Sequence, residues 1–243
     1  MKKLYYLIVV LIGVGCSTDK EQDLSVNLDD ALDDKQIVLD NVIACAASNE
    51  NDDLVSVFFY PRDGATNIGY YETRDSKADK NDFENYYPVE APQVDVFNGY
   101  LKKFEVSVSE EKWVIVTFDE KGKTHLSNPI RLKQDTKPTE YLPQNVSVDP
   151  TNAQMPGFSW KDGKYTDTKI YFQVVSDSQD NLLSGTYTFE KMFQYYDLEN
   201  VVLNITKGTP TALKNETSYG FTLLAVSEDN WVNLFSDIEF EVN

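Results

Sequence analysis

The hexapeptide WVIVTF at residues 113–118 and the hexapeptide FTLLAV at residues 221–226 occupy the same place in two halves of one chain. Beyond them the halves align without a gap, so that Leu126 falls on Leu234, 108 residues later, and Ile130 falls on Ile238. Each half therefore ends in a strand, a polar loop and a second strand. Any two β-hairpins share some alternation, but the ungapped order of the strand ends favours an internal duplication.

The segments that precede these hairpins also match, at a different spacing. Residues 104–108 align with residues 201–205, 97 positions later, and a loop longer by eleven residues in the second half accounts for the difference. We therefore expect two modules, at 37–134 and 140–243. A short polar linker that Pro138 stiffens would join them.

Apolar residues in the body of the chain recur mostly with a period of two. This alternation is clear at residues 55–59, 104–108 and 170–174. Successive side chains of a strand point to opposite faces, so half-buried strands give this period. Only residues 189–198 (FEKMFQYYDL) have a helical period of convincing length. With turn signals such as PRDG at 61–64, the sequence predicts an all-β, antiparallel protein.

The second module resembles the fibronectin type III and immunoglobulin-like β-sandwiches. Trp160, in GFSW, stands where that family has a core tryptophan, and residues 213–226 (LKNETSYGFTLLAV) resemble its tyrosine-corner strand. The resemblance implies that Trp160 is buried and that Tyr219 hydrogen-bonds back to the chain. The first module has Glu111 where the second has Tyr219, so it lacks this mark of the family. We expect two tandem sandwiches of this type, a fold that fixes no function.

A secretion leader precedes the body. Lys2 and Lys3 are followed by eleven uncharged residues at 5–15, whereas a helix that crosses a bilayer needs about 20. Cys16 follows small residues and begins a polar stretch, which resembles the lipobox of bacterial lipoproteins, although Gly13 stands where that pattern prefers Leu. The resemblance implies that residues 1–15 are removed and Cys16 is lipidated. The alternative is a secreted protein in which Cys16 is only a leader residue.

The residues after Cys16 suggest where the protein resides. Ser17 and the acidic tract behind it resemble lipoproteins that are exported to the outer membrane, in the manner of Bacteroidetes surface lipoproteins. We expect a lipid anchor in the outer membrane and exposure on the cell surface, with the periplasmic face as the alternative. Residues 16–36 have little apolar content and predict an acidic tether, with one helical turn near residues 28–32.

Charge and cysteine content narrow the possible partners. The formal net charge is −18, and without Lys2 and Lys3 the chain has 20 basic and 40 acidic residues. Such a surface repels nucleic acid, so we exclude nucleic-acid binding. Once Cys16 is acylated, only Cys45 remains, and no intramolecular disulfide can form. Cys45 lies in an apolar run and is expected to be buried.

The motifs of catalysis and of metal binding are missing from the sequence. His125 is the only histidine, and we expect it to be a solvated residue of the terminal hairpin. The chain has no nucleophile-elbow motif, Walker loop or zinc-spaced Cys/His cluster, so we expect no enzyme activity. Loops at residues 75–82 and 177–181 are rich in the oxygen ligands that calcium prefers, but without EF-hand spacing they predict solvated loops, no metal and no cofactor.

Aromatic residues give the sharper functional hypothesis. Trp231 falls in the predicted loop of the last hairpin, where Asp229 and Asn230 accompany it. Loops at the end of a sandwich often carry recognition, and a tryptophan offers a large contact area. We therefore expect these three residues to bind a ligand and Trp231→Ala to leave stability almost unchanged. The alternative is a ring folded back over its own hairpin.

Three functions remain open at this point. The first is a non-catalytic lipoprotein of the cell envelope that acts as a surface interaction or binding module. A narrower version is a glycan-binding accessory lipoprotein of a polysaccharide-uptake system. The third is a structural partner of an outer-membrane protein complex. The expected partners are accordingly the membrane, through the anchor, and a glycan or an outer-membrane protein. We also expect a fragment that begins near Thr139 to fold alone.

Overall fold

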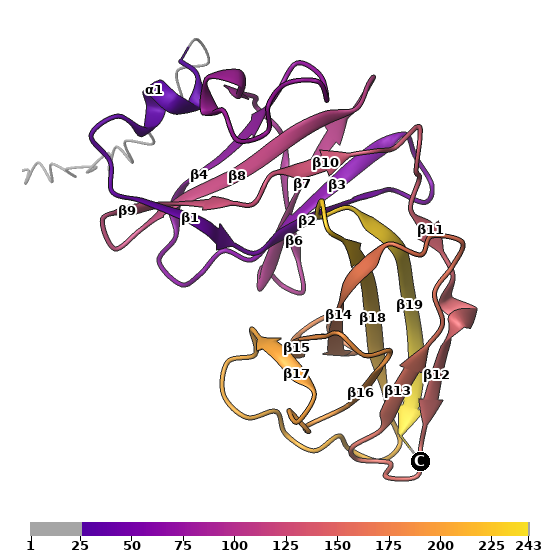
Figure 1. Ribbon diagram of the computed structural model, residues 1–243. Helices are drawn as coiled ribbons and strands as arrows, with labels where there is room; N and C mark the ends of the chain where they lie inside the picture. Colours follow the sequence, from indigo (N-terminus) through magenta and orange to yellow (C-terminus); the bar gives the residue numbers. More distant parts are fainter. Residues whose placement is uncertain (1–25, 243) are drawn as a thin grey trace, which may run out of the picture.

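The computed structural model describes residues 26–242, which form two β-sandwiches set at an angle to each other (Figure 1). The strands of the first sandwich lie within residues 37–132 and those of the second within residues 140–242. The prediction of an all-β fold with two tandem sandwiches is therefore confirmed. The leader and Cys16 lie outside the described residues.

The first sandwich packs one sheet of six strands against a sheet of four. Its strands are β1 (Ile37–Val42), β2 (Ala44–Ser48), β3 (Leu54–Phe59), β4 (Thr66–Glu72), β5 (Tyr87–Pro88), β6 (Gln93–Val96), β7 (Leu101–Ser107), β8 (Lys112–Glu120), β9 (Lys123–Ser127) and β10 (Ile130–Leu132). The larger sheet has the order β1-β9-β8-β4-β5, with β10 also paired to β8, and the smaller has the order β2-β3-β7-β6. Val57, Phe104 and Val116 lie in the core between them.

The second sandwich packs a sheet of six strands against a sheet of three. Its strands are β11 (Glu140–Tyr141), β12 (Val146–Asp149), β13 (Gly157–Trp160), β14 (Thr168–Asp177), β15 (Leu182–Thr188), β16 (Met192–Gln194), β17 (Val201–Asn204), β18 (Thr217–Ser227) and β19 (Val232–Val242). The orders are β11-β19-β18-β14-β15-β17 and β12-β13-β16. Phe158, Phe221 and Leu223 lie in its core. The described residues also contain two 3-10 turns, η1 (Phe83–Asn85) and η2 (Pro143–Asn145).

The predicted repeat is correct for the terminal hairpins and wrong for the strands before them. β8 pairs with β9 and β10 as β18 pairs with β19. However, residues 104–107 lie in β7, which pairs with β3 in the smaller sheet of the first sandwich. The aligned strand β17 pairs with β15 in the larger sheet of the second sandwich. The strand in the place of β7 is β16, paired with β13. Alternation alone does not distinguish strands of the two sheets, because both have a period of two.

The family marks of the second module are confirmed. Trp160 is 5% exposed and packs in the core beside Tyr171 and Phe221. The hydroxyl of Tyr219 accepts a hydrogen bond from the backbone N–H of Lys214 at 2.9 Å, which is the bond of a tyrosine corner. This bond fixes the chain where it enters β18.

The segment with a helical period does not form a helix. Residues 192–194 are the short strand β16, and turns surround it. Phe193 and Tyr195 are buried, while Phe189, Met192 and Leu198 are exposed. Pairing with β13 decides the structure here, because a tertiary contact overrides a weak local preference.

The acidic tether is packed against the first sandwich from residue 28 onward. The short helix α1 (Leu28–Leu32) occupies the predicted turn, and Asn27 caps it by accepting a hydrogen bond from the N–H of Asp30. Leu28 and Leu32 are 1% and 5% exposed and belong to a cluster with Trp113. The prediction of a free spacer is therefore wrong for this part, because two leucines suffice to bury one side of the turn. Within residues 26–242, no helix has the length and apolar character to cross a bilayer.

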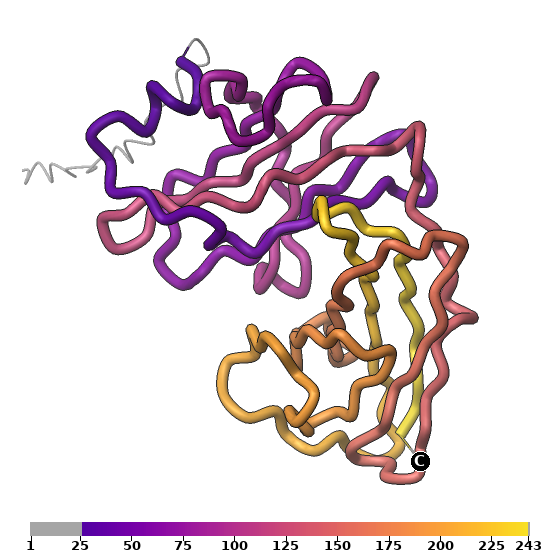
Figure 2. Tube along the Cα trace, viewed as in Figure 1, coloured from indigo at the N-terminus to yellow at the C-terminus, as the bar shows by residue number. Residues whose placement is uncertain are grey.

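Figure 2 shows the chain passing from the first sandwich into the second at a joint between them. Hydrogen bonds also hold the two sandwiches together at this joint. The hydroxyl of Ser48 accepts from the N–H of Thr139 at 2.8 Å, and the hydroxyl of Thr139 accepts from the N–H of Ser48 at 3.1 Å. Tyr141 donates its hydroxyl proton to the backbone oxygen of Ser48 at 2.8 Å. The segment that follows Pro138 is therefore fixed against β2.

Candidate functional site

Trp231, the predicted ligand-binding residue, is buried in this joint. Its exposed fraction is 0%, and its ring belongs to the core of the first sandwich. Its Nε1 donates to the backbone oxygen of Lys137 at 2.7 Å, and its backbone forms a bridge with Ala46. The expectation of an exposed ring is wrong, because the tip of the β18–β19 hairpin inserts into the other sandwich.

Asp229 and Asn230 take part in the same joint. The carboxylate of Asp229 forms an ion pair with Lys133 and accepts a hydrogen bond from Ser227. The side-chain amide of Asn230 donates to the backbone oxygen of Pro129 at 3.2 Å, and its own backbone oxygen accepts from Ala46. The three predicted residues therefore lie together, and their contacts connect the two sandwiches.

His125 is buried, not solvated as predicted. It is 7% exposed, and its Nδ1 lies 2.7 Å from the side-chain oxygen of Asn41. Its Nε2 lies 3.7 Å from a carboxylate oxygen of Glu120, which also accepts from Arg62. The parallel pairing of β1 with β9 brings Asn41 to this position, and the sequence gives no sign of that pairing. The ring is held by structural contacts on both nitrogens.

The acidic loops proposed as calcium alternatives are organised by their own backbone. In the β14–β15 turn, the carboxylate of Asp177 accepts from the N–H groups of Gln179 and Asn181, each at 2.9 Å. The largest influence on the pKa of Asp177 is desolvation, which raises it, but the hydrogen bonds outweigh it and the pKa is lowered. In the described part of the chain, no group of three or more His, Cys, Asp or Glu side chains is placed to hold a metal ion.

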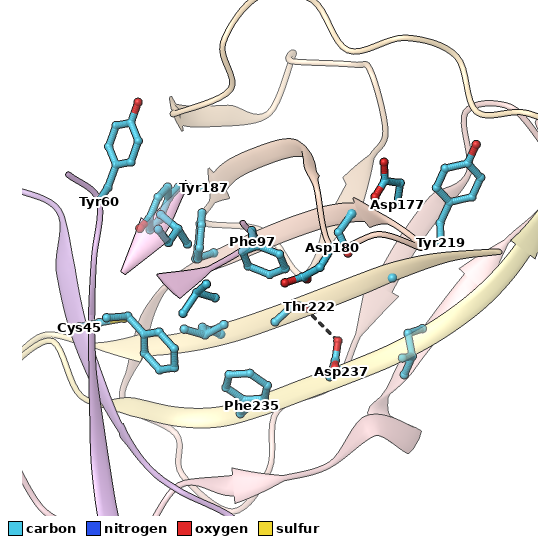
Figure 3. A pocket seen from close by; sticks show the side chains of 18 of the residues that line it. Cys45, Tyr60, Phe97, Asp177, Asp180, Tyr187, Tyr219, Thr222, Phe235 and Asp237 are labelled. Atoms are coloured by element: carbon cyan, nitrogen blue, oxygen red, sulfur yellow. Dashed lines mark hydrogen bonds between the residues drawn. The ribbon is translucent and has the colours of Figure 1, made fainter. Parts of the chain in front are cut away.

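A cleft of about 600 Å³ lies between the sandwiches and is called here the interdomain cleft. Its floor is the face of the β19-β18-β14-β15 sheet that is turned away from the core of the second sandwich (Figure 3). Residues of both sandwiches line the cleft, among them Cys45, Phe58, Phe97, Leu101, Phe172, Ser176, Asp180, Tyr187, Gly220, Thr222, Leu224, Phe235, Asp237 and Glu239. Clefts of this size are typical of small-molecule sites.

Strand register arranges the floor in rows of different polarity. Leu224 of β18 lies opposite Phe172 on one side and Phe235 on the other, which gives an apolar row near the first sandwich. Two residues along, Thr222 lies opposite Asp237, and two further along, Gly220 lies opposite Glu239. The floor therefore changes from apolar to acidic along the strands, since residues i and i+2 share a face.

The first sandwich roofs the apolar end. Cys45 and Leu101 are buried against Phe172, Tyr187 and Leu224 in one cluster that spans both sandwiches. Burial raises the pKa of the Cys45 thiol to about 12, so it stays protonated at neutral pH and acts as an apolar wall. The prediction that Cys45 is buried is confirmed.

The hairpin that joins β6 to β7 extends to the second sandwich beside the cleft. Phe97 and Asn98 have φ of 50° and 51°, a left-handed conformation that is uncommon for residues with side chains. The side-chain amide of Asn98 donates to the backbone oxygen of Gln179 at 2.8 Å, across the cleft. The ring of Tyr100 stacks on the ring of Tyr60, with 5.7 Å between the ring centroids. The hydroxyl of Tyr100 donates a hydrogen bond to the backbone oxygen of Ile205 in the second sandwich. The cleft is thus bounded on two sides by contacts between the sandwiches.

Asp237 lies in the acidic part of the cleft floor and is still exposed to water. Its carboxylate accepts one hydrogen bond, from the hydroxyl of Thr222 at 2.9 Å, which is the dashed line in Figure 3. Desolvation and, after it, the negative charges of Asp180 and Glu239 raise the pKa of Asp237 above its ordinary value. Within residues 26–242, Asp180, Asp237 and Glu239 form no ion pair. This end of the cleft has negative charge without a partner.

These acids are not among the predicted site residues, although one pattern in the sequence points to them. The alternation Phe235, Asp237, Glu239 places an aromatic residue and two acids on one face of one strand. Such a change of polarity along a face marks the edge of a buried surface. In two of the adjacent tyrosine pairs, Tyr87 and Tyr196 are exposed beside buried partners, whereas Tyr70 and Tyr71 are both buried.

Comparison with known proteins adds little to this description. No protein-family model matches the chain, and no curated protein matches it in sequence. Among solved structures, the chicken CNTN1 FN1–FN3 domains match with 16% identity and a TM-score of 0.30, over 85% of this chain and 68% of that chain. A two-domain fibronectin type III segment from chicken tenascin matches with 11% identity and a TM-score of 0.29, over 83% and 97%. The fold assignment accordingly rests on the strand order given above.

Proposed function

We propose that this chain is a non-catalytic binding lipoprotein of the bacterial cell envelope, and that the interdomain cleft is where it binds. The cleft is the single observation that supports this function. It has apolar walls from both sandwiches and a few polar groups at one end, the usual composition of a ligand site. Sandwiches of this type commonly serve as binding or interaction modules without catalysis.

The binding role is tested with a neutral apolar probe, N-phenyl-1-naphthylamine, whose fluorescence rises when it leaves water. Residues 26–243 should bind the probe saturably. Thr222→Phe places a ring in the middle of the floor and should weaken binding by at least about tenfold, which is about 1.4 kcal/mol.

Thr222→Val is the matched control, since it keeps the volume of the side chain and should keep binding. Val96→Trp, on the wall formed by β6, is a second blocking variant if Thr222→Phe does not fold. Equal binding by the wild type and by both blocking variants would place the probe outside the cleft and refute the proposal.

The envelope location rests on the leader and on Cys16. We expect the wild-type protein to incorporate a fatty-acid probe and to sediment with outer membranes, on the cell surface. Cys16→Ser should abolish both labelling and retention in the membrane fraction, whereas Cys45→Ser should change neither. Continued labelling of Cys16→Ser would refute the anchor.

A structural role in an outer-membrane complex is a second candidate, and one observation favours it. Six large apolar side chains are exposed within a short segment of the second sandwich: Phe189, Met192, Tyr196, Leu198, Val202 and Leu203. Exposed apolar groups in one region are typical of protein contacts. If this is correct, replacing Phe189 and Leu198 with serine should release a membrane protein that otherwise co-purifies, while Thr222→Phe should retain it.

A glycan-binding role is the weakest of the three candidates. It depended on Trp231 as an aromatic surface for a sugar ring, and that ring is buried. The cleft offers apolar walls in its place.

A further inference from the structure

We infer that the ligand of the interdomain cleft is an amphipathic cation, a positively charged nitrogen carried on an apolar chain or ring. This inference rests on the proposed function and names the chemical class that the cleft would select. Its basis is the arrangement of charge and apolar surface in the cleft.

The charge in the cleft has one sign. Four acids line it, and no lysine, arginine or histidine is among its lining residues in the described part of the chain. Asp177 is engaged by the backbone of its own turn. Asp180, Asp237 and Glu239 remain as carboxylates without a basic partner. A cation would supply the missing opposite charge.

Apolar surface lies at a short distance from these carboxylates. Asp237 and Phe235 share a face of β19 as residues i and i+2, so the separation of their Cα atoms is about 7 Å for a strand. Beyond Phe235 the cleft continues to Phe97, Tyr187 and Cys45 (Figure 3). A nitrogen at Asp237 and Glu239 would therefore leave a short chain or ring over the apolar row.

The removal of water from Asp237 determines which charge on the ligand is favoured. Asp237 is still exposed to water, and partial desolvation together with the charges of Asp180 and Glu239 raises its pKa. An apolar ligand in the cleft would remove the water that remains around this carboxylate. Leaving a carboxylate unpaired in that state is unfavourable, and an ammonium group beside it reverses the effect. A carboxylate on the ligand would add like-charge repulsion. We therefore expect the cleft to bind a cation most tightly, a neutral molecule less tightly and an anion least tightly.

The experiment compares three eight-carbon molecules: octylammonium, 1-octanol and octanoate. Each competes with N-phenyl-1-naphthylamine for residues 26–243 at pH 7 and low salt. Octylammonium should displace the probe at a concentration at least about tenfold lower than octanol, with octanoate weakest. Salt should reduce the preference, because screening weakens partly exposed charge pairs.

Variants locate the source of the preference. The double variant Asp237→Asn with Glu239→Gln should bind octylammonium and octanol about equally, and Asp180→Asn should reduce the preference in part. The matched control is Glu228→Gln, which removes an exposed charge outside the cleft and should keep the preference.

The outcomes separate the inference from the proposed function. Equal binding of octylammonium and octanol to the wild type would overturn the inference, while the cleft would still be a binding site. A preference that survives in the double variant would also overturn it, because the cation would be recognised elsewhere. Failure of all three molecules to displace a probe that Thr222→Phe excludes would restrict the site to other shapes and overturn the inference. Failure of the probe itself to bind would refute the proposed function.

Discussion

Trp231 belongs to the second sandwich by sequence and to the first by packing. Its backbone lies between β18 and β19, while its ring fills the core beside Ala46 and Val57. The hydrogen bond from Nε1 to Lys137 satisfies the one polar group of the ring. A large aromatic side chain in such a place contributes strongly to stability, since it removes much apolar area from water.

Trp231→Ala should therefore lower the free energy of unfolding by about 3–5 kcal/mol, opposite to the expectation from sequence. The lost ring leaves a cavity and unpairs a backbone oxygen. Chemical denaturation of residues 26–243 measures this change. Phe189→Ala, at a side chain that is 64% exposed, is the control and should stay within about 0.5 kcal/mol of the wild type. Similar values for both variants would contradict the buried position.

The difference between Trp160 and Trp231 shows what the sequence can predict at this scale. Trp160 was placed correctly because it resembles the core tryptophan of a known fold, and Tyr219 because its hydrogen bond spans only five residues. The surroundings of Trp231 come from residues 94 or more positions away, such as Lys137 and Ala46. Local patterns do not contain that information.

Asp237 gives a prediction in pH. Its pKa is raised in the folded protein, so the folded state binds the proton more tightly than the unfolded state. Stability associated with this group is therefore highest below about pH 3.8 and is lost as the pH rises through the raised pKa. Asp237→Asn should increase the free energy of unfolding at pH 7, by less than about 1 kcal/mol because water screens the group, and should give no increase at pH 3. A pH series of urea titrations tests this, and an equal gain at both pH values would contradict it.

At the scale of elements, α1 shows how little apolar content a docked segment needs. The turn has five residues, too few to be stable alone, and it persists because Leu28 and Leu32 pack against the outer face of β8. Composition correctly predicted that this segment is acidic. It incorrectly predicted that the whole segment would be a free tether. The docked part of this segment therefore includes residues 28–32.

Leu32→Ala should cost about 2–5 kcal/mol of stability, as for a buried leucine of a core. The loss should also expose Trp113, whose fluorescence emission would shift to longer wavelength. Asp33→Ala, at an exposed neighbour, is the control. An unchanged denaturation midpoint in Leu32→Ala would show that the turn is not docked in solution.

At the scale of the whole molecule, the two sandwiches share hydrophobic surface. One cluster includes Cys45 and Leu101 of the first and Phe172, Leu224 and Val232 of the second. The interfaces between independent domains are usually smaller and more polar than a shared hydrophobic cluster of this kind. The expectation that the second module folds alone is accordingly replaced by a coupled pair.

Residues 26–243 should therefore unfold in one transition, with equal calorimetric and van't Hoff enthalpies. A fragment that begins at Thr139 should lose cooperativity or associate, because Trp231 and Val232 would be exposed. Scanning calorimetry of the full body and of the fragment tests both statements. Two separate transitions in the full body, one of them matching the fragment, would show that the sandwiches are independent.

The interdomain cleft lies beyond the reach of sequence patterns for the same reason. Alternation predicted most strands, the terminal hairpins and the division near residue 138. The cleft depends on the angle between the sandwiches, which is set by contacts such as Ser48 with Thr139 and Asn98 with Gln179. These contacts join residues 81 to 91 positions apart and have no periodic pattern.

The insertion of Trp231 also limits how a gene of this kind can be rearranged. Tandem sandwiches that only a linker connects can be gained, lost or exchanged one at a time by recombination. Here an excised first half would keep a hole in its interior, and an excised second half would carry an indole ring into water. Any exchange that succeeds must carry both halves together, so the pair is inherited as one unit.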